Sequence, residues 1–506
     1  MKKALLRCQS GLIEVSNDGR ARLPQDVYKR LESRLQYIHK SYVRTAYNPH
    51  TGNRERFIQQ RVAMYMYDSR KFLCCLRGFM PAVLKILRDF GYEVTIRELD
   101  PPKPEKYEPD WDRLVSMFSF RPKQDECLAA IVSQIADLHA VGGGIIDAPP
   151  AFGKMYVIAM ISVLYSKAEI DIVCKNLEVV KSIRELLFQY LPRVGQFGGG
   201  KKEQQRVTVY TAASLRRSNF TADILLADEV DQLMTPTYAP SLGLYENAKR
   251  FGLTATKEMR MDNAHAWLEG LFGPTIFHMA YQEATKLKLV APLCVYWADI
   301  HMNYNPVEDC NDSIDRKRRG IWRNNERNKA IAQAVRVFAE KNMQILVAVD
   351  TIEHALHLRQ YLPEFTVCYA ESSNQDREQA FRRVGLLRAD DPPMTAERRD
   401  CLRNAFERRE VLCVIATPIW SVGVSFDNLE VLVCAGGGQS KTKNIQLPGR
   451  ASRIGNKDYG IVLDFMDLFD PTLHKKSLSR RRDYAKNGWT QYTAEGRPYE
   501  KIRKTT

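Results

Sequence analysis

Short apolar runs alternate with longer helical patterns through most of this 506-residue chain, and they fall into two series. The first series consists of GGGIIDA, IDIVC, RVTVYT, DILLAD and RFGLTAT, and the second of QILVAVD, FTVCYA, VLCVIAT, LEVLVCA and GIVLDF. Strands that alternate with helices are typical of βαβ units, in which the strands run parallel and helices cover the sheet. Two such series predict two tandem α/β domains with parallel sheets, joined near LVAPLCVYW at residues 289–297.

The first hundred residues follow a different pattern, which predicts a small α+β module. LPQDVYKRLESRLQYI predicts an amphipathic helix over residues 23–38, and PAVLKILRDFGYEVTIREL predicts a helix, a glycine-containing turn and a strand over 81–99. DPPKPEKYEPD, at 100–110, is rich in proline and charge and predicts a linker. The expected division is therefore a module with its linker, two α/β domains and a basic tail, with the boundaries 1–106, 107–292, 293–475 and 476–506.

Positive charge is concentrated at the two ends of the chain. The net charge is +15; residues 1–100 contain 19 Lys and Arg against 10 Asp and Glu, and residues 471–506 contain 10 against 3. The residues between these ends are therefore close to neutral. Basic ends favour a polyanionic partner, most simply nucleic acid, and a solvated basic surface is the alternative.

The composition favours a soluble cytoplasmic protein. Hydrophobic residues make up 44% and charged residues 27% of the chain, as in globular proteins. No apolar segment approaches the roughly 20 residues of a membrane span. Arg7, Gln9 and Ser10 interrupt the N-terminal apolar stretch, which argues against a signal peptide. The 11 cysteines are odd in number and lack CxxC spacing, which favours reduced thiols.

A candidate phosphate-binding loop follows the first apolar run. DAPPAFGKMY places Gly153 and Lys154 between a strand and an apolar helix, YVIAMISVLY. At such a junction, backbone N–H groups, the helix dipole and an ammonium group can surround one anion. Ala151 stands in place of the usual first glycine, however, and Met155 in place of a hydroxyl that would bind Mg²⁺. The loop alone leaves phosphate binding and a coincidental Gly-Lys pair equally open.

A second signal is the acidic end of the strand in DILLADEVDQL. Asp228 can hold Mg²⁺ directly or through water, and Glu229 can orient an attacking water. Acidic pairs at strand ends are common, so a solvated loop is the alternative. The order of phosphate loop, acidic strand end and GLTAT within one domain favours a nucleotide site.

These segments stand in the order and spacing of the motifs of superfamily-two helicases. APPAFGKM, LADEVD, GLTAT, VIATPIWSVGVSFDNL and NIQLPGRASR resemble motifs I, II, III, V and VI, and the last contains the QxxGRxxR pattern without a gap. FSFRPKQDECLAAI resembles the segment that holds adenine. VGQFGGGKKEQQRVTVYTAASL, ERNKAIAQAV and HKKSLSRRRDYAKNGW resemble the XPB-like and UvsW-like branch, and within it the branch-migration helicases of large tailed phages are most similar.

The resemblance implies two tandem RecA-like domains, the first with motifs Q, I, Ia, Ib, II and III and the second with motifs IV, V and VI. It implies ATP and Mg²⁺ as cofactors, with Lys154 on the β/γ-phosphates, Asp228 on Mg²⁺ and Glu229 on the attacking water. Two second-domain arginines, Arg450 and Arg453, would neutralise charge on the transferred group. The other implied nucleotide-binding positions are Arg121, Gln124, Pro150, Ala151, Phe152, Gly153, Met155, Gly423 and Gln446.

The resemblance also implies contacts to a nucleic-acid strand, largely through its phosphates. The matching positions are Lys175, Thr211, Thr417 and Ser440, while Thr254 and Thr256 would couple the nucleotide to the strand. A hydroxyl taken by itself is more often a cap or turn residue. Three departures stand out: Asp231 where several relatives have His, Ser425 where many have Asp, and Lys257 where Pro is common.

The predicted function is an ATP-hydrolysing DNA helicase that remodels forks and Holliday junctions in recombination, repair and replication. If the chain is phage-encoded, it would act in the host cytoplasm. The alternatives are a duplex translocase without strand separation, such as the motor subunit of a restriction system, and a nucleic-acid-binding protein with an impaired ATPase. RNA is a further possible substrate, because phosphate contacts do not identify the sugar.

Overall fold

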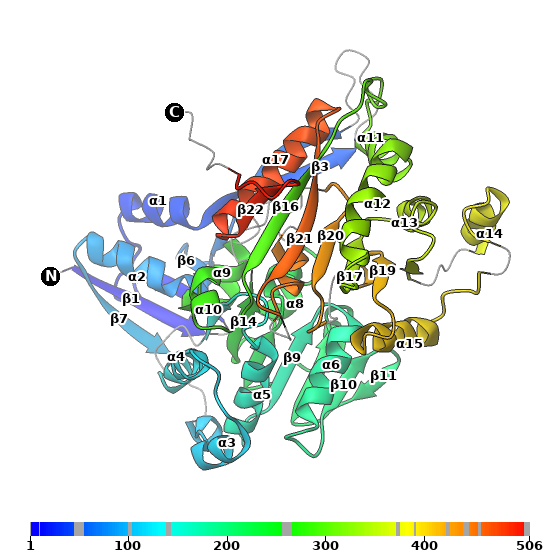
Figure 1. Ribbon diagram of the computed structural model, residues 1–506. Helices are drawn as coiled ribbons and strands as arrows, with labels where there is room; N and C mark the ends of the chain where they lie inside the picture. The colour runs from blue at the N-terminus through cyan, green and yellow to red at the C-terminus, as the bar shows by residue number, and fades with distance from the viewer. Residues whose placement is uncertain are drawn as a thin grey trace. The chain divides into compact units, whose positions relative to one another are not determined.

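The computed structural model describes residues 2–9, 11–44, 55–99, 104–137, 143–255, 266–370, 375–388, 391–420, 426–438, 445–453 and 457–499. The chain forms two compact units (Figure 1). Unit 1 comprises Met1–Val43 and Phe57–Met279, and unit 2 comprises Arg44–Arg56 and Ala280–Thr506. Unit 1 thus contains the N-terminal module and the first α/β domain, and unit 2 contains the second.

The N-terminal module is a five-stranded sheet with two helices on one face. The strand order is β5 (Tyr65–Tyr67), β6 (Leu73–Leu76), β2 (Leu12–Ser16), β1 (Lys2–Gln9) and β7 (Tyr92–Glu98). Alternate residues of β1, namely Ala4, Leu6 and Cys8, are buried in a core shared with α1 (Gln25–Arg34) and α2 (Met80–Asp89). Gly91, with φ +78°, makes the turn from α2 to β7. The helix, turn and strand expected over 81–99 are confirmed.

The helix expected over residues 23–38 is wrong in its last four residues, 35–38. Helix α1 ends at Arg34, and β3 (Gln36–Arg44) follows and pairs with β4 (Glu55–Ala63). Leu35 is still buried and completes the apolar stripe of the helix. Beyond it the sequence QYIHKSYVR is rich in aromatic and β-branched residues, which favour a strand.

The module packs directly on the first α/β domain. At Gly78 the backbones are so close that a Cβ atom would collide with the carbonyl oxygen of Glu269. Trp267 Nε1 donates a hydrogen bond of 3.0 Å to Tyr37 Oη. The segment expected as a linker is also held, because Tyr107 is buried and donates to the carbonyl of Asp223.

The first α/β domain has a mostly parallel eight-stranded sheet. The order is β11 (Lys201–Glu203), β10 (Gly195–Gly198), β12 (Val207–Thr211), β9 (Ile170–Cys174), β13 (Ile224–Ala227), β14 (Lys249–Thr254), β8 (Gly143–Asp147) and β15 (Thr275–His278). Only the pairing of β10 with β11 is antiparallel among the pairings that the structure describes here.

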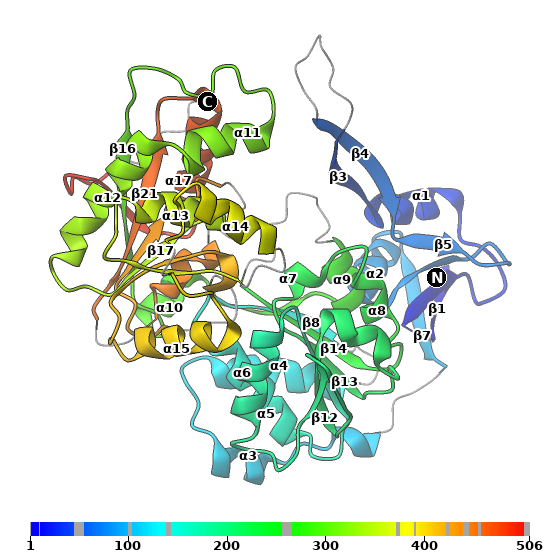
Figure 2. The ribbon, with the colours of Figure 1, turned by 90° about the vertical axis from the view of Figure 1, so that its right-hand side faces the viewer.

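Helices cover both faces of this sheet, as Figure 2 shows. One face carries α4 (Gln124–Ala136), α5 (Lys154–Leu164) and α6 (Leu177–Leu187), with α3 (Trp111–Met117) against α5. The other face carries α7 (Val230–Leu233), α8 (Ala239–Gly243) and α9 (Ala266–Phe272), which share one core with the strands. The central strands β9 and β13 are fully buried, which explains why they appear in the sequence as continuous apolar runs.

The second α/β domain has a seven-stranded sheet in which every described pairing is parallel. The order is β18 (Thr366–Cys368), β19 (Cys413–Ala416), β17 (Ile345–Ala348), β20 (Val431–Cys434), β21 (Gly460–Asp467), β16 (Leu293–Ile300) and β22 (Thr490–Thr493). Its helices are α10 (Tyr281–Lys286), α11 (Ser313–Lys317), α12 (Asn325–Ala339), α13 (Ile352–Arg359), α14 (Gln375–Arg383), α15 (Ala396–Glu407) and α17 (Pro471–Lys486). The two tandem α/β domains predicted from the sequence are confirmed.

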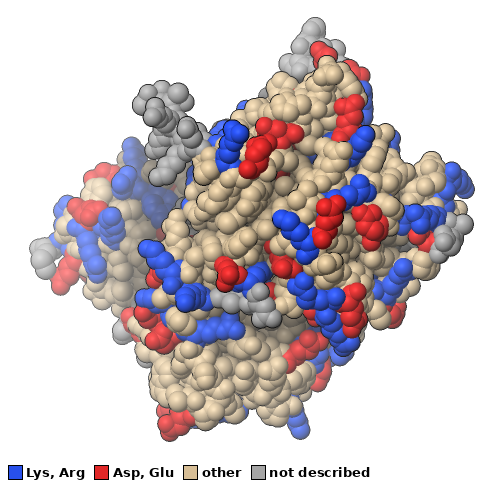
Figure 3. Space-filling view, viewed as in Figure 1, with Lys and Arg blue, Asp and Glu red and all other residues tan. Residues whose placement is uncertain are grey.

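Surface charge, cysteine chemistry and the character of the helices add three observations. On the face drawn in Figure 3, Lys and Arg are interspersed with Asp and Glu, so positive charge is not gathered into one patch on that face. All 11 cysteines are free thiols. Among the described residues, no helix combines the length and the apolar character of a membrane span.

Candidate functional site

The carboxyl edge of the first sheet brings together most of the first-domain residues singled out from the sequence. In the order of the sheet, Thr211 ends β12, Lys175 follows β9, Asp228 follows β13, Thr254 ends β14, and the phosphate-loop candidate follows β8. Because the strands are parallel, residues far apart in the sequence meet at one edge. This edge is where open α/β sheets bind ligands.

The loop between β8 and α5 is held in an unusual backbone conformation. Ala151 has φ +68° and Gly153 has φ +92°, both in the left-handed region. A Cβ atom at Gly153 would lie 2.6 Å from Gln124 Nε2, so glycine is required there for two reasons. Phe152 is buried and stacks on Phe277, with ring centroids 5.4 Å apart. Pro150 and Met155 lie half-buried on either side of this bend.

Lys154 points back into this loop. Its ammonium donates hydrogen bonds to the carbonyl oxygens of Ala148, at 2.8 Å, and Pro149, at 3.1 Å. Burial lowers the pKa of Lys154, and the nearby carboxylates of Asp228 and Glu229 oppose that shift. The hydrogen-bond partners described for Lys154 are thus neutral carbonyls of its own loop.

The segment before α4 supports the loop from one side. Gln124 is buried, accepts a hydrogen bond of 3.1 Å from the backbone N–H of Arg121 and donates one of 3.1 Å to the carbonyl of Phe152. The Arg121 guanidinium lies over the ring of Tyr156, 5.5 Å from its centroid. Gln124 therefore ties the segment that resembles an adenine-binding motif to the loop.

The acidic strand end lies on the far side of β14. Asp228 is 7% exposed, and burial raises its pKa, while the Lys154 ammonium and the Glu229 N–H oppose this rise. Glu229 has φ +47°, which is strained for a residue with a side chain. A strained acidic residue beside a buried carboxylate and a buried ammonium is the arrangement typical of a reactive site.

Asp231 is the position where the sequence departs from several relatives. Its Oδ1 accepts a hydrogen bond of 2.7 Å from Thr254 Oγ1, and both side chains are buried. The acidic strand end is thus tied to the end of β14, where the sequence indicated a coupling residue. Thr256, the other coupling position, lies outside the described residues.

Lys175 and Thr211 lie farther along the same edge. Lys175 is exposed and donates a hydrogen bond of 3.0 Å to Gln232 Oε1. Thr211 is 8% exposed and donates to Ser214 Oγ at 2.8 Å. Gln232 was missed from the sequence, because a glutamine one turn beyond an acidic pair has no signature of its own.

The second-domain positions lie in two segments of unit 2. Thr417 follows β19 and is 7% exposed. Gln446 and Arg450 are half-buried, and Arg450 ends a short 3₁₀ helix, Pro448–Arg450. Arg453 Nη1 lies 3.3 Å from Asp427 Oδ1. Gly423 and Ser440 lie outside the described residues, as does Ser425.

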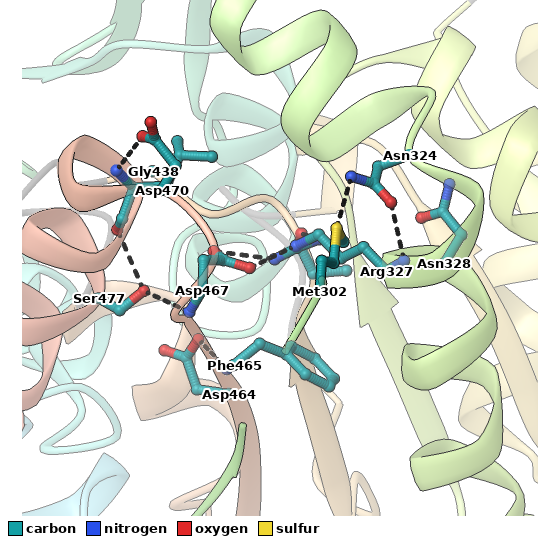
Figure 4. Close-up of polar contacts among 12 residues, drawn as sticks. Met302, Asn324, Arg327, Asn328, Gly438, Asp464, Phe465, Asp467, Asp470 and Ser477 are labelled. Carbon is teal, nitrogen blue, oxygen red and sulfur yellow. Dashed lines mark hydrogen bonds and ion pairs between the residues drawn. The ribbon is translucent and has the colours of Figure 1, made fainter. Parts of the chain in front are cut away.

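Two arginines in buried ion pairs also hold the chain that follows β20. Arg327 of α12 donates to Asp467 Oδ1 at 2.7 Å and to the carbonyl of Ala435 at 2.8 Å (Figure 4). Arg480 of α17 is paired with Asp464 at 2.9 Å and donates to the carbonyl of Gly438 at 3.0 Å. The chain that follows β20 is therefore fixed by guanidinium groups from two helices.

No protein-family model matches the sequence. A protein of Sulfolobus islandicus filamentous virus (isolate Iceland/Hveragerdi), named "Putative helicase 22", is 23% identical over 394 residues. That alignment spans 71% of this chain and 66% of the viral protein, slightly less than two thirds of the relative's own length.

Several solved structures have a similar fold. S. cerevisiae Dbp5 bound to RNA and ADP BeF3 aligns with 76% of this chain and 93% of its own, at 12% identity and a TM-score of 0.51. A fragment described as a "putative HsdR subunit" of a type I restriction enzyme from Vibrio vulnificus YJ016 aligns with 92% of this chain and 94% of its own, at 14% identity and a TM-score of 0.52. This chain shares the tandem RecA-like fold of these structures.

The tandem RecA-like fold that the ordered motifs implied is confirmed by these structures. UvsW of phage T4 aligns over 97% of this chain and 99% of its own, at 16% identity and a TM-score of 0.40. In the helicase fold, the edge that carries Lys154, Asp228 and Glu229 is the carboxyl edge of the first RecA-like sheet.

Proposed function

We propose that this chain is an ATP-driven motor that moves on nucleic acid and remodels branched DNA. The observation that carries the proposal is the meeting of Lys154, Asp228 and Glu229 at one edge of a parallel sheet, in a helicase fold. The pKa values of Lys154 and Asp228 are shifted by burial at this edge, and each charge opposes the shift of the other.

The residues of the loop between β8 and α5 fit the phosphates of a nucleoside triphosphate. Gly153 permits the left-handed backbone of the loop and its close approach to Gln124. Among the described residues, Lys154 donates to two neutral carbonyl oxygens, which a negatively charged phosphate can replace as the stronger acceptor. Lys154 would bind the β/γ-phosphates, and Gln124 with Arg121 would hold the base. Pro150, Ala151, Phe152 and Met155 shape the loop.

Asp228 is the proposed ligand of Mg²⁺. Mg²⁺ is commonly held by one or two carboxylates together with phosphates and water, so a single carboxylate suffices although Met155 supplies no hydroxyl. Bound Mg²⁺ would supply charge neutralisation to the phosphoryl group. Glu229 would orient the attacking water, and Arg450, Arg453 and Gln446 would complete the site from the second domain.

The nucleic-acid strand is proposed to follow the carboxyl edges of both sheets. Lys175, Thr211 and Thr417 lie at strand ends, and Ser440 is proposed by its place in the motif. Contacts to phosphates would hold a strand without reading its sequence. The basic N-terminal module would bind the adjoining duplex, which is the reason for proposing branched substrates.

The decisive experiment measures ATP turnover with single-stranded, duplex, forked and four-way-junction DNA and with matched RNA. We expect turnover to rise with DNA, most strongly with branched forms, and to fall by about 1,000-fold in Lys154→Ala and Glu229→Gln. Lys167→Ala, on the surface of the same domain, is the matched control for Lys154→Ala. Undiminished turnover in either site variant would remove the assignment, and greater stimulation by RNA would change the substrate.

A duplex translocase without strand separation is the second candidate. The HsdR fragment from a type I restriction enzyme has a similar fold over 92% of this chain. A gel assay separates the two candidates, since a translocase hydrolyses ATP on duplex DNA but converts neither a fork nor a four-way junction. Undetectable turnover on every substrate would instead favour a binding protein with an impaired ATPase.

A further inference from the structure

A chain of hydrogen bonds connects a proposed strand contact to the proposed water-orienting residue. Lys175 Nζ donates to Gln232 Oε1 at 3.0 Å, and Gln232 Nε2 donates to Glu229 Oε2 at 2.9 Å. Lys175 lies just after β9 and Glu229 just after β13, which are neighbouring strands of the sheet. The side chain of Gln232 spans the distance between these two strand ends.

The backbone holds Gln232 in the place that this bridge requires. Its N–H donates to the carbonyl of Glu229 at 2.8 Å, which closes a turn at the start of α7. Val230, Asp231 and Leu233 are buried around it, whereas Gln232 is half-buried. The backbone of Gln232 therefore fixes where its side chain begins, and its amide oxygen and amide nitrogen reach Lys175 and Glu229.

We propose that Gln232 is a positioning residue that restrains Glu229 until a nucleic-acid phosphate engages Lys175. This inference rests on the proposed function and deepens it, because it names how strand binding would stimulate turnover. While the bridge is intact, Glu229 Oε2 accepts a hydrogen bond from an amide. When the bridge opens, that oxygen is available to a water.

A nucleic-acid phosphate and the amide oxygen of Gln232 would compete for the Lys175 ammonium, and the phosphate is favoured. The ammonium is exposed, and its present acceptor is a neutral amide oxygen. A phosphate oxygen is a stronger acceptor, because it adds a negative charge opposite the ammonium, whereas the amide oxygen of Gln232 is neutral. Loss of Lys175 also weakens the second bond, since hydrogen bonds in a chain strengthen one another.

The test compares ATP turnover with and without single-stranded DNA in Gln232→Ala and in the wild-type chain. We expect turnover without DNA to rise about tenfold in Gln232→Ala, the shift that corresponds to the loss of one hydrogen bond to a charged group. Turnover with DNA should stay near the wild-type value, so the ratio of the two falls toward one. Thermal unfolding of each variant is measured beside it.

Two further variants distinguish restraint from a structural effect. Lys175→Met removes the other end of the bridge on an exposed side chain, and it should also raise turnover without DNA while weakening DNA binding. Gln204→Ala removes a different glutamine, whose Oε1 accepts from Tyr210 Oη at 2.7 Å in the same domain, and it should change neither rate.

The outcomes separate this inference from the proposed function. If the wild-type chain is stimulated by DNA and both Gln232→Ala and Lys175→Met keep its DNA-free rate, the inference is overturned and the proposed function stands. If the wild-type chain shows no turnover with any nucleic acid, the proposed function itself fails. A DNA-free rate raised in Lys175→Met supports the bridge even if Gln232→Ala does not fold.

Discussion

The two α/β domains both bury charged side chains, but they satisfy them differently. In the second domain, Arg327 and Arg480 meet the carboxylates of Asp467 and Asp464 directly and use further donors on backbone carbonyls. In the first domain, Lys154 is held by carbonyl oxygens of its own loop. Charges paired with carboxylates inside the protein stabilise one arrangement of the backbone, whereas a charge held by replaceable neutral groups remains available to a ligand.

The largest effect should come from breaking a pair in the second domain. Arg480→Leu leaves Asp464 buried without its cation, although Tyr484 Oη still donates to that carboxylate at 2.7 Å. We expect the free energy of unfolding to fall by about 3–5 kcal/mol, measured by urea denaturation. The double variant Arg480→Leu with Asp464→Leu should recover part of the loss, and a loss equal to the sum of the single variants would show that the two residues are not a unit.

A smaller effect should come from Lys249, a buried cation of the first domain whose described hydrogen-bond acceptor is a backbone carbonyl. Lys249 is 4% exposed, its Nζ donates to the carbonyl of Asp137 at 3.2 Å, and burial lowers its pKa to about 8. Between pH 8 and about 10.4, the pKa of an unperturbed lysine, the unfolded chain binds more protons than the folded chain. The free energy of unfolding therefore rises with pH through that window, as the destabilisation by the buried Lys249 ammonium is relieved. Below pH 8 Lys249 is protonated in both the folded and the unfolded chain, so its destabilising effect has its full size.

Lys249→Met should therefore be more stable than the wild-type chain at pH 7, by about 2–3 kcal/mol. The difference between the two should shrink as the pH rises from 8 to 10, because the wild-type lysine loses its proton. Urea midpoints at pH 7, 9 and 10 measure this difference. A gap that is constant across the series would contradict the assigned pKa.

The smallest effect should come from the departure within the phosphate loop. Met155→Thr supplies the hydroxyl that the loop lacks and should lower the Mg²⁺ concentration for half-maximal turnover about threefold, since it adds one weak ligand to the proposed shell. Titration of turnover with Mg²⁺ measures the change. No change, or lower activity, would count against the idea that the missing hydroxyl weakens the proposed Mg²⁺ shell.

Much of the fold could be predicted because its strands are buried on both faces. The runs IDIVC and RVTVYT correspond to β9 and β12 almost residue by residue, since a parallel strand covered by helices must be apolar throughout. The N-terminal strands β1 and β2 were not predicted. They are buried on one face only, so their sequences KKALLRCQ and LIEVS alternate with polar residues and lack a continuous run.

The candidate site could be predicted from the sequence only in part. The order of the motifs identified Lys154, Asp228 and Glu229, and their roles in this chain stay a prediction. The hydrogen bonds through Gln232 and between Asp231 and Thr254 could not be predicted, because they depend on which strands are neighbours in the sheet. Sequence spacing carries no information about the strand order that places β9 beside β13.

The contact of Gly78 with Glu269 makes the N-terminal module a lever arm on the first RecA-like domain. At that point backbone meets backbone with no side chain between them, and the Trp267–Tyr37 hydrogen bond adds a second attachment. A module hung from a flexible tether would turn independently of the domain and transmit no force. A module joined in this way is expected to turn with the domain, so that a small rotation at the proposed nucleotide site would become a longer displacement at the module's outer strands.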